Sequence, residues 1–269
     1  IPVGAVCDVT ETDAAGASTP AAAAQVTIPD SLSTGNAANL TMTNDFATST
    51  LTVTKAIDNG GALDANGEPV TYPGEYEFTA TCSFESTSEL LGVDDQDFTL
   101  GDGDSRTITG LPQGTSCKVT ETGKGNAVST SVAVGTDASA TGSSVSVIIG
   151  AEPKPITFTN HYLTGAATIT KQLTGAGADA WGAGPFVLRT YCTLDTDHNS
   201  ATDPAVVYNG TAELTSSNLV WNLTRLASGA ECTVSEEASG GANTAATDQS
   251  FTVGSDEAEP SQVTMTNDF

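Results

Sequence analysis

The stretch CKVTE at residues 117–121 decides the fold, because the same strand-like pattern occurs three times in this chain of 269 residues. It returns as CDVTE at 7–11 and as CTVSE at 232–236. In each copy cysteine, valine and glutamate alternate with polar residues, which is the period-two pattern of a β-strand with one buried face. The three copies therefore predict the same strand in three copies of one domain.

Two further motifs recur in a constant order around this strand. A lysine motif precedes it and an asparagine motif follows it: TVTK at 52–55 and TITK at 168–171; TMTNDF at 41–46, TFTNHY at 157–162 and TMTNDF at 264–269. Equivalent motifs of the complete copies lie about 115 residues apart, which indicates tandem repeats. We expect complete domains at 49–163 and 164–269, and the back half of a third at 1–48. Either a longer repeat protein or another subunit would supply the missing front half.

The composition favours an all-β protein. Thr, Ser, Ala, Gly and Val dominate, and β-branched residues interleaved with small polar ones are typical of short strands and turns. We therefore predict tandem immunoglobulin-like β-sandwiches stacked end to end, since no long Pro-rich or Gly/Ser-rich linker separates the repeats.

The charge excludes some partners. The formal net charge is −25, whereas nucleic acid and anionic membranes attract basic surfaces. No stretch of about 18 apolar residues predicts a membrane span, so we expect no membrane insertion in this segment.

The five cysteines fit the repeats. Each complete copy has two, so the economical pairs are Cys82–Cys117 and Cys192–Cys232, with Cys7 lacking a partner in the partial copy. Reduced, buried thiols are the alternative. Paired cysteines in an acidic β-rich chain favour an oxidising, extracellular compartment.

Three apolar strand faces in each complete copy end in a polar residue. These residues are Lys55, Glu121 and Asn160 in one copy, and Lys171, Glu236 and Asn267 in the next. Strand phase favours Glu236 over its neighbour Glu237. A buried ammonium or carboxylate must be paired or neutralised. An ordinary ion pair, or side chains that extend to solvent at the strand ends, would also explain the pattern.

Together, TVTK, LPQGTSCKVTETG (111–123) and TFTN resemble the collagen-adhesin B-type (CnaB-like) immunoglobulin-like domains of Gram-positive surface proteins and pilins. The resemblance covers essentially the whole chain. It implies a spontaneous isopeptide bond between Lys55 and Asn160, and between Lys171 and Asn267, with Glu121 and Glu236 catalysing proton transfer. Glu11 and Asn44 match the same motifs without a lysine partner. The paired cysteines are a departure from the usual members.

The implied function is a structural segment of an extracellular or cell-wall-associated stalk, adhesin or pilus-like fibre. Its partners would be neighbouring repeats or subunits. A module that recognises a host or carbohydrate ligand is the alternative. We expect no cofactor and no enzyme beyond a single autocatalytic event. A weaker pattern of side chains with hard oxygen atoms suggests a calcium site, although the spacing does not match an EF-hand. These residues are Asp195, Asp197, Asn199 and Asp203.

Overall fold

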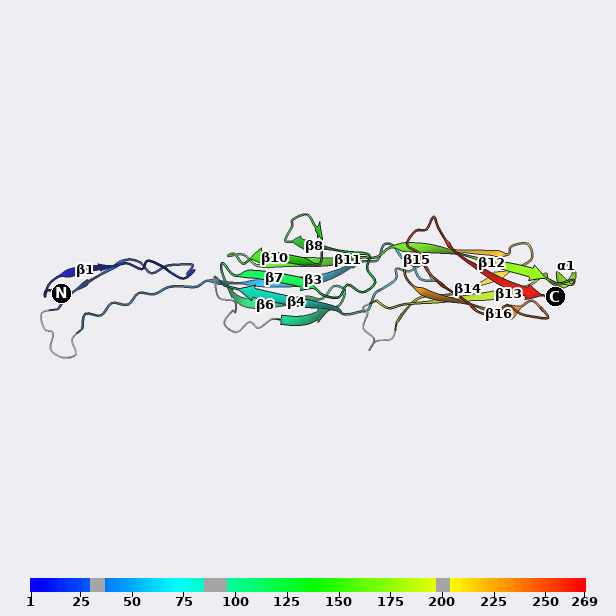
Figure 1. Cartoon of the computed structure of the whole chain (residues 1–269), viewed down its shortest axis with the longest axis horizontal. Coiled ribbons are helices and arrows are strands. Elements are labelled where there is room, and N and C mark those ends of the chain that lie inside the picture. The colour runs from blue at the N-terminus through cyan, green and yellow to red at the C-terminus, as the bar shows by residue number, and fades with distance from the viewer. Residues whose placement is uncertain (30–36, 85–95, 197–203) are drawn as a thin grey trace.

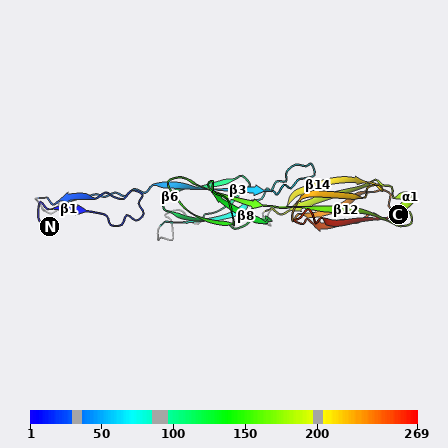
Figure 2. The same ribbon diagram turned by 90° about the horizontal axis from the view of Figure 1, so that it is seen from above.

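The computed structural model describes residues 1–29, 37–84, 96–196 and 204–269. In these ranges the regular elements are strands and one four-residue helix, joined by turns and loops. The chain extends along a single axis with the two termini at opposite ends (Figures 1 and 2). Two β-sandwiches lie in line along this axis (Figure 1). The predicted class of all-β sandwiches stacked end to end is confirmed. Within the described part of the chain, no helix is long and apolar enough to cross a membrane.

The first sandwich is built of a four-stranded and a five-stranded sheet. The smaller sheet has the order β10 (Ser144–Ile148), β7 (Ser116–Glu121), β4 (Tyr76–Ser83) and β5 (Gln96–Leu100). The larger sheet has the order β6 (Ser105–Pro112), β3 (Thr48–Asp58), β11 (Lys154–His161), β8 (Ser129–Val134) and β9 (Ala140–Thr141). Alternate residues of both sheets, such as Val53, Phe158, Phe78 and Val119, meet in one buried core. This pattern follows from the period-two repeat of apolar side chains in the sequence.

The first and last strands of this sandwich are parallel neighbours. In the register of β3 and β11, Lys55 lies opposite Phe158, and Asn160 lies opposite Ile57. The lysine and asparagine motifs, about 100 residues apart in the chain, are therefore brought side by side at one end of the core.

The second sandwich repeats this arrangement with fewer strands. One sheet has the order β15 (Val220–Ala227), β12 (Thr164–Thr174) and β18 (Ser261–Asp268). The other has the order β14 (Ala205–Leu214), β13 (Phe186–Leu194), β16 (Glu231–Ser239) and β17 (Gln249–Thr252). Helix α1 (Ala178–Trp181) follows β12 at the far end (Figure 1). Strands β12 and β18 are parallel, as β3 and β11 are.

The described residues that precede β3, 1–29 and 37–47, form a separate, thin unit at the N-terminal end (Figure 1). Its strands β1 (Val6–Val9) and β2 (Ala24–Thr27) make a two-stranded antiparallel ladder. Near the first sandwich, Gln113 N–H donates to the Ala47 carbonyl at 2.9 Å, and the rings of Phe46 and Phe84 are 6.2 Å apart.

The junction between the sandwiches is tightly packed. Side chains of the first repeat lie in the same buried cluster as the core of the second: Ala62, Val70, Tyr72, Ala127 and Tyr162. The Tyr162 hydroxyl donates to the Thr196 carbonyl at 3.2 Å, and Arg225 Nε donates to the Gly61 carbonyl at 2.8 Å. At Gly125 (φ +58°) a Cβ atom would lie 1.9 Å from the Thr196 carbonyl oxygen, so this approach requires glycine. The shared apolar core opposes bending between the two sandwiches.

Candidate functional site

The polar residues at the ends of the apolar strand faces are buried. Lys55 and Asn160 are fully buried, and Glu121 is 4% exposed. In the second sandwich Lys171 and Asn267 are likewise buried, and the side chain of Glu236 is 1% exposed. The side chains therefore point into the core instead of extending to solvent, and the structure brings each set of three together.

In the first site, one carboxylate oxygen of Glu121 contacts both the lysine nitrogen and the amide nitrogen of the asparagine. Glu121 Oε1 lies 3.4 Å from Lys55 Nζ and accepts a hydrogen bond from Asn160 Nδ2 at 2.9 Å. Asn160 Nδ2 also donates to the Lys124 carbonyl at 3.2 Å. Because two acceptors face Nδ2, the orientation of the carboxamide is defined.

Burial changes the protonation of the lysine. Desolvation lowers the pKa of Lys55 from 10.5 to about 8, and the nearby Glu121 carboxylate opposes this shift without cancelling it. The Lys55 ammonium donates to the Ala56 carbonyl at 2.9 Å and lies 4.6 Å from the centre of the Tyr76 ring. A large fraction of Lys55 is therefore a neutral amine at mildly alkaline pH. The neutral amine is the nucleophilic form of lysine.

The second site has the same arrangement, with the lysine nitrogen closer to the glutamate. Lys171 Nζ lies 2.6 Å from Glu236 Oε1 and donates to Asn267 Oδ1 at 2.5 Å. Asn267 Nδ2 donates to the same Glu236 oxygen at 3.0 Å and to the Ser239 carbonyl at 3.0 Å. Desolvation lowers the pKa of Lys171, and the hydrogen bond and charge of Glu236 oppose the shift. Of the two adjacent glutamates, Glu236 is the one that contacts Lys171 and Asn267.

The N-terminal unit holds the remaining two motif residues in contact with each other. Asn44 Nδ2 donates to Glu11 Oε1 at 2.7 Å, and the Ala21 N–H donates to Asn44 Oδ1 at 2.7 Å. The Glu–Asn half of the site is thus formed in residues 1–48 at an exposed position.

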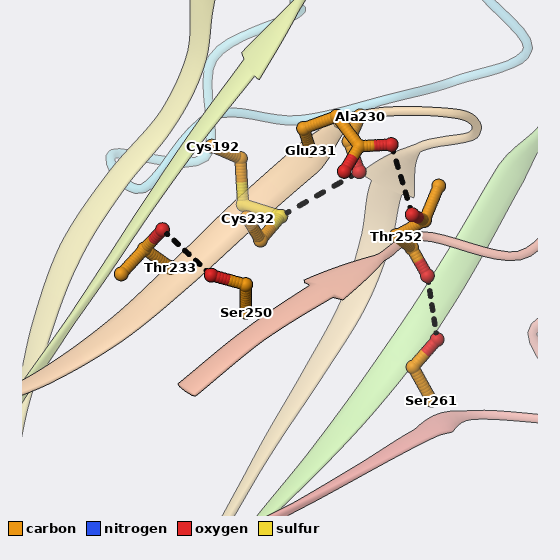
Figure 3. The surroundings of a disulfide bond; sticks show 8 residues. All are labelled: Cys192, Ala230, Glu231, Cys232, Thr233, Ser250, Thr252 and Ser261. Atoms are coloured by element: carbon orange, nitrogen blue, oxygen red, sulfur yellow. Dashed lines mark hydrogen bonds between the residues drawn. A yellow bond between two sulfur atoms is a disulfide. The ribbon is translucent and has the colours of Figure 1, made fainter. Parts of the chain in front are cut away.

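Both cysteine pairs are disulfides that join directly opposite residues of neighbouring antiparallel strands. Cys82 of β4 is bonded to Cys117 of β7, and Cys192 of β13 to Cys232 of β16. Figure 3 shows the second of these, beside the pairing of β16 with β17. Cys7 is free and partly exposed. Each disulfide shares its strand with a site glutamate, because Cys117 and Glu121 both lie on β7, and Cys232 and Glu236 on β16.

The suggested calcium ligands are largely beyond what the structure describes. Asp197, Asn199 and Asp203 lie outside the described residues, and Asp195 lies at the junction, where its carbonyl accepts from Asn126 Nδ2 at 2.7 Å. Among the described residues, no group of three or more His, Cys, Asp or Glu side chains is placed to hold a metal ion.

The motifs did not reveal every residue of the sites. Thr130 of β8 contacts both Glu121 and Asn160, and the backbone of Ala246 contacts both Glu236 and Asn267. The signal for Thr130 was its place on the same strand face as the buried Val132. Ala246 acts through its main chain, so no pattern of side chains could reveal it.

Fold and sites together define a tandem β-sandwich protein with a buried Lys–Glu–Asn set and a cross-strand disulfide in each sandwich. The chain belongs to the DUF5979 family, described as a domain of unknown function, whose model matches residues 51–163 and 167–269. No curated protein matches the sequence significantly.

Solved structures with a similar fold include Gram-positive pilins and adhesins. The major pilin of Streptococcus pyogenes is 15% identical, with a TM-score of 0.40 over 83% of this chain and 99% of the pilin. An adhesin of Mobiluncus mulieris, described as containing intramolecular disulfide, isopeptide and ester bond cross-links, is 19% identical with a TM-score of 0.33. That match covers 45% of this chain and 42% of the adhesin, so the chain spans less than half of the adhesin's length.

Proposed function

We propose that each complete sandwich forms an intramolecular isopeptide bond, Lys55 to Asn160 and Lys171 to Asn267. One observation carries the proposal: in both sites a single glutamate oxygen contacts the lysine nitrogen and the asparagine Nδ2 at once. This is the geometry required of a group that moves a proton from an attacking amine to a leaving amide nitrogen.

The reaction is an amide exchange without an external reactant. The neutral Nζ of Lys55 attacks Cγ of Asn160 and forms the new C–N bond. Glu121 Oε1 accepts a proton from Nζ and delivers it to Nδ2, so that the Cγ–Nδ2 bond breaks and ammonia leaves. Packing in the core replaces a bimolecular encounter with a high effective concentration. Each glutamate acts once on its own chain, so the reaction is a maturation step and not an enzymatic turnover.

The bond would serve a mechanical purpose, because it ties the first strand of a sandwich to the last. Force applied along the chain enters at β3 and leaves at β11, two parallel neighbours that would otherwise slide apart once their hydrogen bonds break. The disulfide holds a second pair of strands in the opposite sheet. Together with the packed junction, these ties suit a stiff, protease-resistant segment of a surface stalk or pilus-like fibre.

Several broader expectations belong to the same proposal. The disulfides favour an oxidising, extracellular location at the cell surface. The partners are neighbouring repeats or subunits of the same fibre. The proposed repeats are 49–163 and 164–269, with half a repeat at 1–48, and the two separate sets of sheets support this division.

The intact mass of the folded protein tests the bonds directly. Each Lys–Asn bond should lower the mass by about 17 Da, the mass of ammonia, in addition to the two hydrogen atoms lost for each disulfide. After digestion, one linked peptide should contain Lys55 and Asn160, and another Lys171 and Asn267. A mass that shows only the disulfide deficit would exclude the bonds.

The rate of bond formation in the first sandwich should rise with pH up to about 8 and then level off. Below the lowered pKa of Lys55, about 8, each pH unit reduces the neutral amine about tenfold. Above that pKa the amine is already neutral, so further base adds no nucleophile. The measurement is the time course of ammonia loss by mass spectrometry between about pH 5 and about pH 9.5. A rate that still climbs tenfold per unit at the alkaline end would mean that Lys55 titrates like an exposed lysine.

A further inference from the structure

Thr130 is the buried polar residue of the first site that the Lys–Glu–Asn scheme leaves without a role. It lies on β8 directly opposite Asn160 and is 5% exposed. Its hydroxyl oxygen lies 3.1 Å from Glu121 Oε2 and 2.8 Å from Asn160 Oδ1. It thus bridges the carboxyl oxygen that does not face the lysine and the carbonyl oxygen of the reacting amide.

The second site has a donor at the same place, but of a different kind. The backbone N–H of Ala246 lies 3.1 Å from Glu236 Oε2 and 2.8 Å from Asn267 Oδ1, the same two distances that Thr130 makes. In the N-terminal unit the Ala21 N–H donates to Asn44 Oδ1 at 2.7 Å. Every asparagine of the set therefore has a donor on its carboxamide oxygen besides any contact with the lysine. In the first sandwich this donor is a side chain, whereas in the second sandwich and in the N-terminal unit it is a backbone N–H.

This donor lies where negative charge develops during the proposed reaction. When Nζ bonds to Cγ of Asn160, the C=O double bond opens and Oδ1 becomes an oxyanion, which a preorganised donor stabilises. The Thr130 hydroxyl has a single hydrogen and cannot donate to both oxygens at once. In the ground state it can donate to either oxygen, and Oδ1 is the nearer of the two, at 2.8 Å against 3.1 Å for Glu121 Oε2. As negative charge develops on Oδ1, the hydroxyl hydrogen is drawn to that oxygen.

We propose that Thr130 is a catalytic residue of the first sandwich, whose hydroxyl stabilises the oxyanion that forms on Asn160. The second sandwich uses the Ala246 main chain for the same purpose. This inference rests on the proposed isopeptide bond and adds a residue to its mechanism. No net proton passes through Thr130: the proton taken from Nζ reaches Nδ2 by Glu121 Oε1, and Thr130 returns to its starting hydrogen bonds when ammonia leaves.

The two substitutions Thr130→Val and Thr130→Ser separate chemistry from packing. Valine keeps the branched shape and removes the hydroxyl, whereas serine keeps the hydroxyl and removes the methyl group. Loss of one oxyanion donor slows such reactions by about 100- to 1,000-fold. We expect Thr130→Val to slow ammonia loss in the first sandwich by about that factor, Thr130→Ser to react close to the wild-type rate, and the second sandwich to react normally in both.

The full chain, produced in a short expression and then incubated, gives these rates from the fraction of linked peptides for each sandwich over time. The Cys82–Cys117 disulfide and the near-ultraviolet circular dichroism verify that each variant is folded, and Thr130→Ala provides a second hydroxyl-free variant if the valine does not fit. Wild-type rates in the folded valine or alanine variant, or a serine variant as slow as valine, would overturn the role of Thr130 and leave the bond itself intact. Absence of ammonia loss from both sandwiches of the wild-type protein would instead overturn the proposed function, and this inference with it.

Discussion

The Asn160→Ala variant is expected to unfold its first sandwich on the order of 20 °C below the wild type. In the chain-entropy model, a cross-link that closes a loop of about 100 residues stabilises the folded state by roughly 5 kcal/mol. In a domain of this size each kcal/mol shifts the melting temperature by about 4 °C. Asn160→Ala removes the electrophile while Lys55 and Glu121 keep their contact with each other, so the buried ammonium is not left unpaired.

Differential scanning calorimetry of the full chain measures this effect, with the second sandwich as an internal reference. Glu121→Gln blocks the same bond through a different residue and also removes the carboxylate beside the buried Lys55, so its drop should be at least as large. Asn267→Ala should lower the melting temperature of the second sandwich by a similar amount and leave that of the first unchanged. If the wild type carries the bond and Asn160→Ala melts within a few degrees of it, the cross-link does not supply the stability that we assign to it.

Removal of the first disulfide by Cys82→Ala with Cys117→Ala is expected to cost about 4 kcal/mol of unfolding free energy in the first sandwich. The two cysteines are 35 residues apart, and the chain-entropy model gives this value for a loop of that length. Both sulfur atoms are buried in the core, so the substitutions also leave a small cavity. The effects of disulfide and isopeptide bond should add approximately, because each closes a different loop.

Denaturation in guanidinium chloride, followed for each sandwich, gives this free energy. Cys7→Ala is the matched control, because Cys7 is free and its loss should leave both transitions unchanged. A thiol titration of the native protein should find Cys7 reactive and the other four cysteines protected. A change below about 1 kcal/mol in the double variant would contradict the stabilising role.

The strand faces and their polar ends could be read from the sequence. Alternation places Lys55 on the same strand face as Leu51 and Val53, and strand phase with Cys232 favours Glu236 over Glu237. Because a strand has a period of two, the sequence alone determines which side chains enter the core. It therefore predicted the all-β class and the polar residues that the core encloses. A ligand for the alternative, adhesive function stays a prediction of the sequence alone.

Contacts between distant strands were decided by the tertiary structure. The pairing of β3 with β11 places Lys55 near Asn160, and the facing sheet places Glu121 Oε1 between their nitrogen atoms. Thr130 reaches the first site because the strand register pairs it with Asn160, and the Ala246 main chain reaches the second because its loop passes beside Asn267. The alternation of residues within one strand predicts neither contact. The same holds at the junction, where Tyr72 and Tyr162 of the first repeat join the core of the second. Periodicity is a property of one strand, whereas a site made by four segments depends on how sheets pack, and only the folded chain determines that.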